Sequence, residues 1–519
     1  MKHTTGFLIL LLLLNACARV GRPTGGDKDV TPPQLLSSEP KHGATGFKGH
    51  EIILHFNEYV TIKNPEKNIL ISPPFNNMPV IKPAGIASKT FKIILKDSLL
   101  PNTTYQINFG ESIADFNEGN KLEHLQLVFS TGLTIDSLTL KGIVNPVYYN
   151  EKKPKKMLIG LYPAKSFKDS LIYNTKPYYV GLTDEKGHFK LNHLKAGKYT
   201  IIALDDVNSD YKYQPGKEGV GFLNQMITIP KDSVVSLNLF KEQPAFSIEK
   251  ITQHSKNHIV IDYKGSRDSL RIKLNIPVTD SLLSVDYQKA HLWYKSPSDS
   301  IKLSISVKNR LKKFFRKRSE DIDSLMIDLS GNQRFNPIDT LLIAANMPLI
   351  KIDSSKIIFQ KDSLKTAFHL KRYRNRYLLD FNKQTGYTYQ LSLLPKAVTG
   401  FLGQQNKDTI RTQIKIPKAE TYGTLLIHIN TKQNMPLFVE VIKNHKIIRK
   451  TPTRHTSDFE IKYLPAGRYN IRVVFDDNAN NRWDPGSYLK HQQPERTFEP
   501  AQPVEIRANW EVNQTYNID

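Results

Sequence analysis

The sequence predicts an all-β fold, arranged as a tandem array of β-sandwiches. Short stretches alternate between apolar and polar residues, as strands with one buried face do; in residues 51–57, for example, Ile52, Leu54 and Phe56 fall on one side. Clusters of Pro, Gly and Asn separate these stretches at the spacing typical of sandwiches. At roughly 100 to 150 residues per domain, a chain of 519 residues is expected to hold four or five cores.

The first 16 residues have the pattern of a signal peptide. Lys2 and His3 give a basic start, and residues 7–14 form an apolar run that is too short to span a bilayer as a mature helix. Residues 14–17, Leu-Asn-Ala-Cys, resemble the lipobox of bacterial lipoproteins, in which the cysteine is acylated and becomes the first residue. This resemblance implies a lipid anchor on Cys17, with the membrane as partner. A plain secretory signal with a chance cysteine is the alternative.

Residues 17–33 are rich in Gly, Pro and charge, which predicts a flexible tether that lifts the first domain off the headgroups. Ala18 stands where enteric lipoproteins retained in the inner membrane carry aspartate, so we expect delivery to the outer membrane. Residues 18–22 are basic and depart from the acidic surface-export tag of Bacteroidota lipoproteins, so we expect a location that faces the periplasm. No later segment has eighteen uninterrupted apolar residues.

Residues 34–132 are expected to form the first sandwich. The order of residues 40–44, 53–58, 100–105, 113–120 and 129–132 resembles the bacterial Ig-like domain of S-layer (SbsA-type) and related surface proteins. Asp115, Asn117 and Asn120 fall in a predicted loop, where turns between side chain and backbone account for them better than a bound cation does.

Residues 135–242 and 421–519 are predicted to be two copies of one fold. Residues 187–199 recur as residues 457–469 without a gap, and the register continues for a further 17 residues. The pattern resembles the carboxypeptidase regulatory-like, or transthyretin-like, β-sandwich, a module that accompanies enzymes and surface proteins but carries no catalysis.

Each copy contains a polar loop with alternating oxygen ligands, the arrangement of the first half of a calcium loop. The second half does not fit, because Tyr211 and Asn481 stand where an EF-hand requires Gly, and Lys217 and Ser487 where it requires Glu. We therefore expect a turn stabilised by Asx side chains and keep structural calcium as the alternative. The candidate ligands are Asp206, Asn208, Asp210, Asp476, Asn478 and Asn480.

Residues 244–343 are expected to form a sandwich of uncertain type, and residues 345–417 a diverged second Ig-like sandwich. The densest basic run of the chain lies in the former. We expect a solvated loop or short helix there; contact with an anionic polymer or headgroups is the alternative. The candidate anion-binding residues are Lys308, Arg310, Lys312, Lys313, Arg316, Lys317 and Arg318.

The sequence contains no zinc-protease, serine-hydrolase, phosphate-loop or dinucleotide-binding motif. We therefore expect a non-enzymatic, cofactor-free outer-membrane lipoprotein of Bacteroidota type that serves as a structural or interaction module of the cell envelope. The net charge of +24 suggests an alternative function, the binding of acidic glycan or lipopolysaccharide. The basic run, or aromatic loop residues such as Tyr213 and Trp483, would make this contact. Other envelope proteins are further candidate partners, whereas nucleic acid is not expected in this compartment. A hydrolase with accessory sandwiches is a third hypothesis, which requires a deep polar pocket within residues 244–343.

Overall fold

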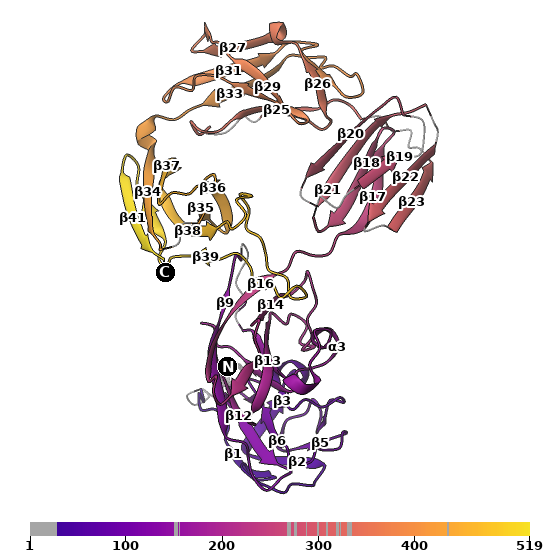
Figure 1. Cartoon of the computed structure of the whole chain (residues 1–519), viewed down its shortest axis with the longest axis vertical. Helices are drawn as coiled ribbons and strands as arrows, with labels where there is room; N and C mark the ends of the chain where they lie inside the picture. The colour runs from indigo at the N-terminus through magenta and orange to yellow at the C-terminus, as the bar shows by residue number, and fades with distance from the viewer. Residues whose placement is uncertain are drawn as a thin grey trace, which may run out of the picture.

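The computed structural model describes residues 28–149, 154, 156–266, 271–274, 278–286, 288–297, 300–307, 310–317, 321, 323–329, 335–432 and 435–518. The regular structure is almost entirely β-strand, which confirms the predicted all-β fold. Five units follow one another along the chain (Figure 1).

The first unit is a two-sheet sandwich. One sheet has the order β1-β2-β5-β4, with β7 added to β2, and the other has the order β3-β6-β8. Phe56, predicted to face inward from β2, is buried in its core, as is Tyr105 of β6. Its elements are β1 (Leu35–Glu39), β2 (Glu51–Ile62), α2 (Pro65–Asn68), β3 (Leu70–Ser72), β4 (Val80–Lys82), β5 (Ser88–Ile94), β6 (Thr104–Asn108), β7 (Ile113–Asp115) and β8 (Gln126–Ser130).

The second unit is built on the order β11-β10-β13-β14-β16-β9-β12, with β15 added to β13. Strand β16 runs parallel to β9, whereas β12 pairs with β9 in the antiparallel sense. Its elements are β9 (Leu138–Pro146), β10 (Leu158–Pro163), η1 (Ala164–Ser166), α3 (Leu171–Asn174), β11 (Tyr179–Leu182), β12 (His188–Leu194), β13 (Gly197–Leu204), β14 (Gly219–Phe222), β15 (Ile227–Ile229) and β16 (Val234–Lys241).

The third unit contains a four-stranded sheet, β17-β18-β21-β20, and a three-stranded sheet, β19-β22-β23. Residues 310–317 of the basic run form β23, which pairs with β22 over eight residues, so the expected loop or short helix is wrong there: backbone pairing holds these residues extended. The strands are β17 (Ser247–Ser255), β18 (His258–Lys264), β19 (Arg271–Leu274), β20 (Asp280–Asp286), β21 (Lys289–Lys295), β22 (Ser300–Val307) and β23 (Arg310–Lys317).

The fourth unit begins earlier than predicted. Strands β24 and β25 form a sheet with β30 and β29, and Leu341 and Ile343 are part of the same core as Leu379. The predicted division at residues 343–345 is therefore wrong, because it cuts through β25. The elements are β24 (Ile327–Leu329), β25 (Leu341–Ala345), β26 (Leu349–Ile352), η3 (Ser354–Lys356), β27 (Ile357–Lys361), β28 (Leu364–Lys365), β29 (His369–Tyr373), β30 (Arg376–Asp380), β31 (Thr388–Leu393), β32 (Val398–Gly400) and β33 (Ile410–Lys415).

The fifth unit has the sheets β37-β34-β41 and β36-β35-β38-β39, with β40 added to β38. Its alternating apolar residues, such as Tyr469, Ile471 and Val473, are buried in one core. Its elements are η4 (Ala419–Thr421), β34 (Tyr422–Asn430), β35 (Leu437–Lys443), β36 (Lys446–Lys450), β37 (Asp458–Pro465), β38 (Gly467–Phe475), β39 (Thr497–Phe498), β40 (Val504–Ile506) and β41 (Glu511–Asn517).

Strand pairing repeats in two pairs of units. In the fifth unit β34 pairs in parallel with β41 and antiparallel with β37, as β9 does with β16 and β12 in the second unit. In the fourth unit β24-β25-β30-β29 repeats β1-β2-β5-β4 of the first unit, and β27-β31-β33 repeats β3-β6-β8. The sequence repeats therefore correspond to repeated folds.

Buried tyrosines repeat with the same contacts. The amide N–H of Leu100 donates to the Tyr105 hydroxyl at 2.8 Å, and that of Gln384 donates to the Tyr389 hydroxyl at 3.0 Å. In the other pair of units, the Tyr199 and Tyr469 hydroxyls each donate to the carbonyl four residues upstream. Each tyrosine ties a strand to the turn before it.

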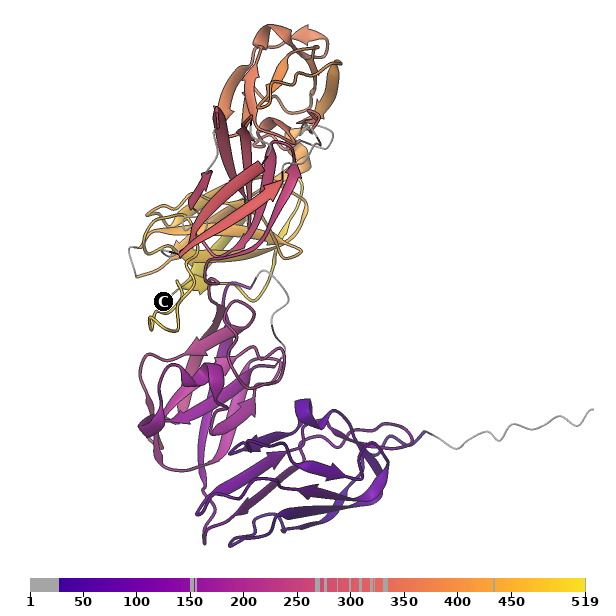
Figure 2. The same ribbon diagram turned by 90° about the vertical axis from the view of Figure 1, so that its right-hand side faces the viewer.

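The five units do not form an open string. The first and second units contact each other where β3 lies beside β11 and Ser72 Oγ bonds with the backbone of Val180. The third, fourth and fifth units then lead away from the second unit and back to it, so that the fifth contacts the second (Figures 1 and 2). The second to fifth units thus form a closed ring, to which the first is attached.

Candidate functional site

Several sequence-predicted site residues lie where the structure describes little. Cys17 and the tether as far as residue 27 lie outside the described residues, as do Lys308 and Arg318. The other basic candidates are on β23, for which only the backbone is described. The lipid anchor and the basic site therefore stay predictions.

The polar loop of the second unit is organised around Asp206. The two oxygens of this carboxylate accept the amide N–H groups of Asp210 and Tyr211, at 3.2 and 3.0 Å, and Asn208 accepts the same Asp210 N–H. Glu218 joins the ends of the loop, because its oxygens accept the amides of Val207 and Gln214 at 3.2 and 2.9 Å. The oxygens proposed as cation ligands thus accept backbone hydrogen bonds, as predicted for an Asx turn.

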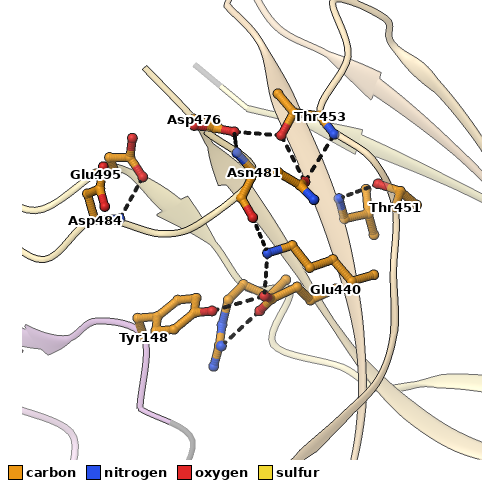
Figure 3. Close-up of polar contacts among 11 residues, drawn as sticks. Tyr148, Glu440, Thr451, Thr453, Asp476, Asn481, Asp484 and Glu495 are labelled. Atoms are coloured by element: carbon orange, nitrogen blue, oxygen red, sulfur yellow. Dashed lines mark hydrogen bonds and ion pairs between the residues drawn. The ribbon is translucent and has the colours of Figure 1, made fainter. Parts of the chain in front are cut away.

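The loop of the fifth unit repeats this arrangement. Asp476 accepts the amides of Asn480 and Asn481 at 3.0 and 2.7 Å, and also the Thr453 hydroxyl. Glu495 accepts the amides of Asp477 and Asp484 at 3.0 and 2.8 Å. Figure 3 shows Asp476, Asn481 and Thr453 together, with the Asp484–Glu495 contact beside them. Glu495 joins the two ends of its loop as Glu218 does in the second unit. The repeat therefore includes this buried glutamate, which we call the closing glutamate of each loop.

Burial determines the protonation of the closing glutamates. Burial raises the pKa of Glu495 to about 7 despite its two amide donors, and nearby Asp484 and Asp476 add to the rise. Burial also raises the pKa of Glu218 and that of Asp206. Within the described parts of the chain no group of three or more His, Cys, Asp or Glu side chains has a metal-binding arrangement. Calcium binding at these loops stays the alternative hypothesis.

A buried cluster of charged and aromatic side chains lies where the second and fifth units meet, and the sequence did not indicate it. Glu440 and Arg472 are almost fully buried and form an ion pair at 3.2 Å. The Tyr148 hydroxyl of the second unit donates to Glu440 at 2.9 Å, as Figure 3 shows, and Arg472 donates to the Tyr149 carbonyl at 3.3 Å. We call Tyr148, Tyr149, Glu440, Arg472 and Trp483 the junction cluster.

Aromatic stacking completes the junction cluster. The Tyr148 ring stacks on Trp483 with centroids 4.2 Å apart and planes inclined by 8°. The Arg472 guanidinium carbon lies 4.3 Å from the centroid of the same ring, within reach of a cation–π contact. Burial and the Glu440 carboxylate raise the pKa of Tyr148, which keeps its hydroxyl a donor. Trp483 is therefore engaged within the protein instead of forming a ligand-binding loop tip.

A loop of the fifth unit, residues 484–493, extends this contact onto the second unit. Tyr488 is 1% exposed and packs with Phe222 of the second unit, with ring centroids 5.4 Å apart. Glu242 accepts both the Tyr213 hydroxyl and the Tyr488 amide, each at 2.6 Å. A Cβ at Gly486 would lie 2.5 Å from the Phe240 ring, so the close approach requires glycine. Tyr213, a candidate aromatic loop residue for glycan binding, is only 2% exposed, so its ring is not available to such a ligand.

The third unit contains a cluster of His, Ser and Asp side chains. Ser255 donates to Asp323 at 2.6 Å, and His258 Nε2 lies 3.0 Å from His291 Nδ1. The His258 ring stacks on Trp293 at 3.6 Å and is 4% exposed. Burial, followed by His291 and His254, lowers the pKa of His258 to about 3, far from the value that suits a general base. This cluster is packed, and the serine is paired with the aspartate instead of a histidine.

Residues 29–131 match the family described as bacterial Ig-like domain. This match and the sandwich topology support the expected Ig-like character of the first unit. Among curated proteins, nothing matches this chain. The described residues contain no helix long and apolar enough to cross a membrane.

Several solved structures with tandem domains align over much of this chain, but their TM-scores are low. The S-layer protein rSbsC(31-844) is 10% identical, with a TM-score of 0.16, and the match covers 70% of this chain and 64% of that one. The Bacillus anthracis TIE protein is 12% identical, with a TM-score of 0.14 and coverage of 95% and 76%. The N-terminal eight Ig domains of Down Syndrome Cell Adhesion Molecule are 9% identical, with a TM-score of 0.16 and coverage of 93% and 74%. A bacterial Ig-like domain followed by four further sandwich units fits a structural or interaction module.

Proposed function

We propose that this protein is a non-enzymatic lipoprotein, held at the outer membrane of a Bacteroidota-type envelope by acyl groups on Cys17, and that its ring of sandwiches is a rigid structural or interaction module. The observation that carries this proposal is a buried ion pair at the contact between the second and fifth units. Glu440 and Arg472 of the fifth unit form this pair and bond to Tyr148 and Tyr149 of the second unit, so that they join the two units. Such groups fix the relative positions of the units and leave their outer surfaces for partners.

We also propose that the second and fifth units are transthyretin-like, or carboxypeptidase regulatory-like, domains. Their shared strand pairing, with one parallel pair beside an antiparallel pair in each, supports this proposal. Their repeated polar loops use the carboxylates for backbone hydrogen bonds. Both features suit accessory modules that carry no reaction.

Metabolic labelling with a palmitate analogue tests the anchor. The natural protein should be labelled and found with membranes, whereas Cys17→Ala should be unlabelled and released. Cys17→Ala keeps every described contact, so loss of label cannot come from misfolding of the sandwiches. Equal labelling of both proteins would contradict the anchor.

Protease treatment of intact cells tests the membrane face. We expect protection in intact cells and cleavage after the outer membrane is permeabilised, because residues 18–22 are basic. Cleavage in intact cells would assign the protein to the cell surface and leave the lipid anchor untouched.

A second function, binding of acidic glycan or lipopolysaccharide, is favoured by the β29–β30 hairpin. Lys371, Arg372 and Arg374 are exposed there, with Arg376 on the adjoining strand and Tyr373 48% exposed between them. Four cations within six residues, beside an exposed ring, suit an anionic sugar polymer better than a random surface does.

Neutralising the hairpin tests this second function. A variant with Lys371, Arg372, Arg374 and Arg376 changed to Gln should bind lipopolysaccharide at least tenfold more weakly, and the natural protein should lose affinity as salt rises. The matched control changes four exposed lysines of the second unit, Lys186, Lys190, Lys195 and Lys198, to Gln. A second variant neutralises the basic run from Lys308 to Arg318. Binding that is insensitive to salt, or equal in all variants, would contradict this function.

A further inference from the structure

The first unit contains an apolar cavity of about 450 Å³ that both of its sheets line. Ile62, Ile81 and Ile93 contribute from one sheet, and Ile71 and Ile107 from the other. The segment around β4 and the start of α2 form its rim. Its volume lies within the range of natural ligand sites.

The lining determines which chemistry can enter. Apart from Glu66, every lining side chain is Ile, Val, Met, Pro, Ala or Gly, and none is aromatic. Glu66 is exposed at the rim, so the interior offers no side-chain hydrogen-bond partner to a sugar or an amide. A polar group buried there would lose its hydration without compensation, whereas a hydrocarbon would be stabilised.

The edge beside the cavity is poorly suited to a peptide strand. Strand β4 is the edge of its sheet and has only three residues, with Pro79 before it and Pro83 after it. Proline has no N–H group to donate, and short edge strands flanked by proline resist pairing with a further strand. The shape and chemistry thus favour a hydrocarbon chain that enters the cavity over a peptide strand that pairs with β4.

We propose that this cavity binds a single alkyl chain whose headgroup is neutral or cationic. The exposed Glu66 carboxylate at the mouth attracts a cationic headgroup and repels a fatty-acid carboxylate. Each methylene that becomes buried strengthens binding about fourfold. Either a bilayer lipid or an acyl group on Cys17 can supply such an alkyl chain. The inference therefore does not rest on the lipid anchor.

Calorimetric titration of full-length mature Cys17→Ala protein tests the inference. The probes are dodecyltrimethylammonium and dodecanoate, each below its micelle concentration. We expect saturable binding of one dodecyltrimethylammonium per chain, at least tenfold weaker binding of dodecanoate, and a smaller difference between the probes in Glu66→Gln. Octyltrimethylammonium should bind more weakly than the dodecyl probe.

Variants that fill the cavity give the decisive comparison. Ile81→Phe and, from the exposed rim, Ala84→Leu should each weaken binding at least tenfold. The control is Ile53→Phe, at a half-buried position of β2 that does not line the cavity. Folding of each variant is checked by its thermal unfolding, and Ala84→Leu keeps the test valid if Ile81→Phe is unstable. Absence of saturable binding, or equal binding by Ala84→Leu and Ile53→Phe, would overturn the inference.

Comparison with the acylated natural protein then distinguishes the two sources. Residue 29 lies on the side of the first unit where β7 is, because Asn120 donates to the Asp29 carbonyl, and β7 pairs with the end of β2 at Ile62, which lines the cavity. Dodecyl binding that is blocked in the acylated protein and restored in Cys17→Ala assigns the occupant to Cys17. Equal binding by both forms assigns it to a lipid from outside the chain.

Discussion

Single buried side chains determine how the loops and units are held. Glu495 and Glu218 accept hydrogen bonds from amides at both ends of their loops, and each has a pKa raised by burial. Their carboxylates are the acceptors that the open ends of these loops require. These two residues therefore link the acidity of the solution to the order of the loops.

We predict that Glu495 makes the fifth-unit loop less stable as the pH rises. Its pKa is about 7 in the folded protein and 4.5 when exposed, so the folded state binds the proton more strongly. Its contribution is full below pH 4.5 and is lost as the pH rises through 7, by about 3 kcal/mol at most. Hydrogen exchange of residues 477–484, corrected for intrinsic rates, should show this trend, and Glu495→Gln should flatten it. An unchanged trend in Glu495→Gln would contradict the assignment.

We predict the opposite pH dependence for the third unit. His258 has a pKa of about 3 in the folded protein and 6.5 when exposed, so unfolding takes up a proton. Its contribution is full above pH 6.5 and is lost as the pH falls toward 3, by about 5 kcal/mol at most. His258→Phe, which keeps a ring against Trp293, should reduce the acid sensitivity of exchange in β18 and β21. Equal acid sensitivity in both proteins would count against this role.

At the residue scale, the sequence predicted the polar turns, because contacts between residues close in the sequence determine them. Asp206 and Asp476 stabilise turns because each accepts amides four and five residues ahead. Glu440 and Arg472 could not be predicted, since they are 32 residues apart and their partner Tyr148 is on another unit. Local patterns do not show which distant side chains fold against one another.

At the scale of elements, alternation predicted most strands, and the failures have physical causes. The predicted division at residues 343–345 fails because β25 crosses it, and Leu341 and Ile343 of this strand are part of the fourth core. The charge of the basic run predicts a loop or short helix, yet pairing with β22 makes residues 310–317 a strand, β23. Pairing between strands overrides local composition in both cases.

We predict that the loop of residues 484–493 secures the fifth unit to the second through Tyr488. Tyr488→Ala removes a buried ring from the contact with Phe222 and should cost about 3 kcal/mol of docking free energy. Hydrogen exchange should accelerate in this loop and in β14, while β35 and β41 stay protected. The control is Leu489→Ala, because Leu489 is 64% exposed. Equal exchange in the two variants would show that the ring does not secure the loop.

At the scale of the molecule, the contact between the second and fifth units closes the arrangement of the sandwiches. The sequence predicts a row of independent sandwiches, and the structure closes four of them into a ring (Figure 1). Asn336 of the fourth unit donates to the Tyr463 carbonyl of the fifth at 2.7 Å, and Trp293 of the third packs with Met347 and Phe401 of the fourth. Each unit thus has two neighbours within the ring, which limits hinge motion between them.

The rigid module that we propose depends on ring closure, and cross-linking between the second and fifth units is a direct measurement of that closure. Asp169 and His491 approach to 3.1 Å across the contact and are both partly exposed, so cysteines placed there in the Cys17→Ala protein should react together with a short bis-maleimide. The control pair joins Asp169→Cys to Lys365→Cys, on β28 of the fourth unit. We expect rapid intramolecular cross-linking of the first pair in the monomer. Cross-linking of that pair at the rate of the control pair would contradict it.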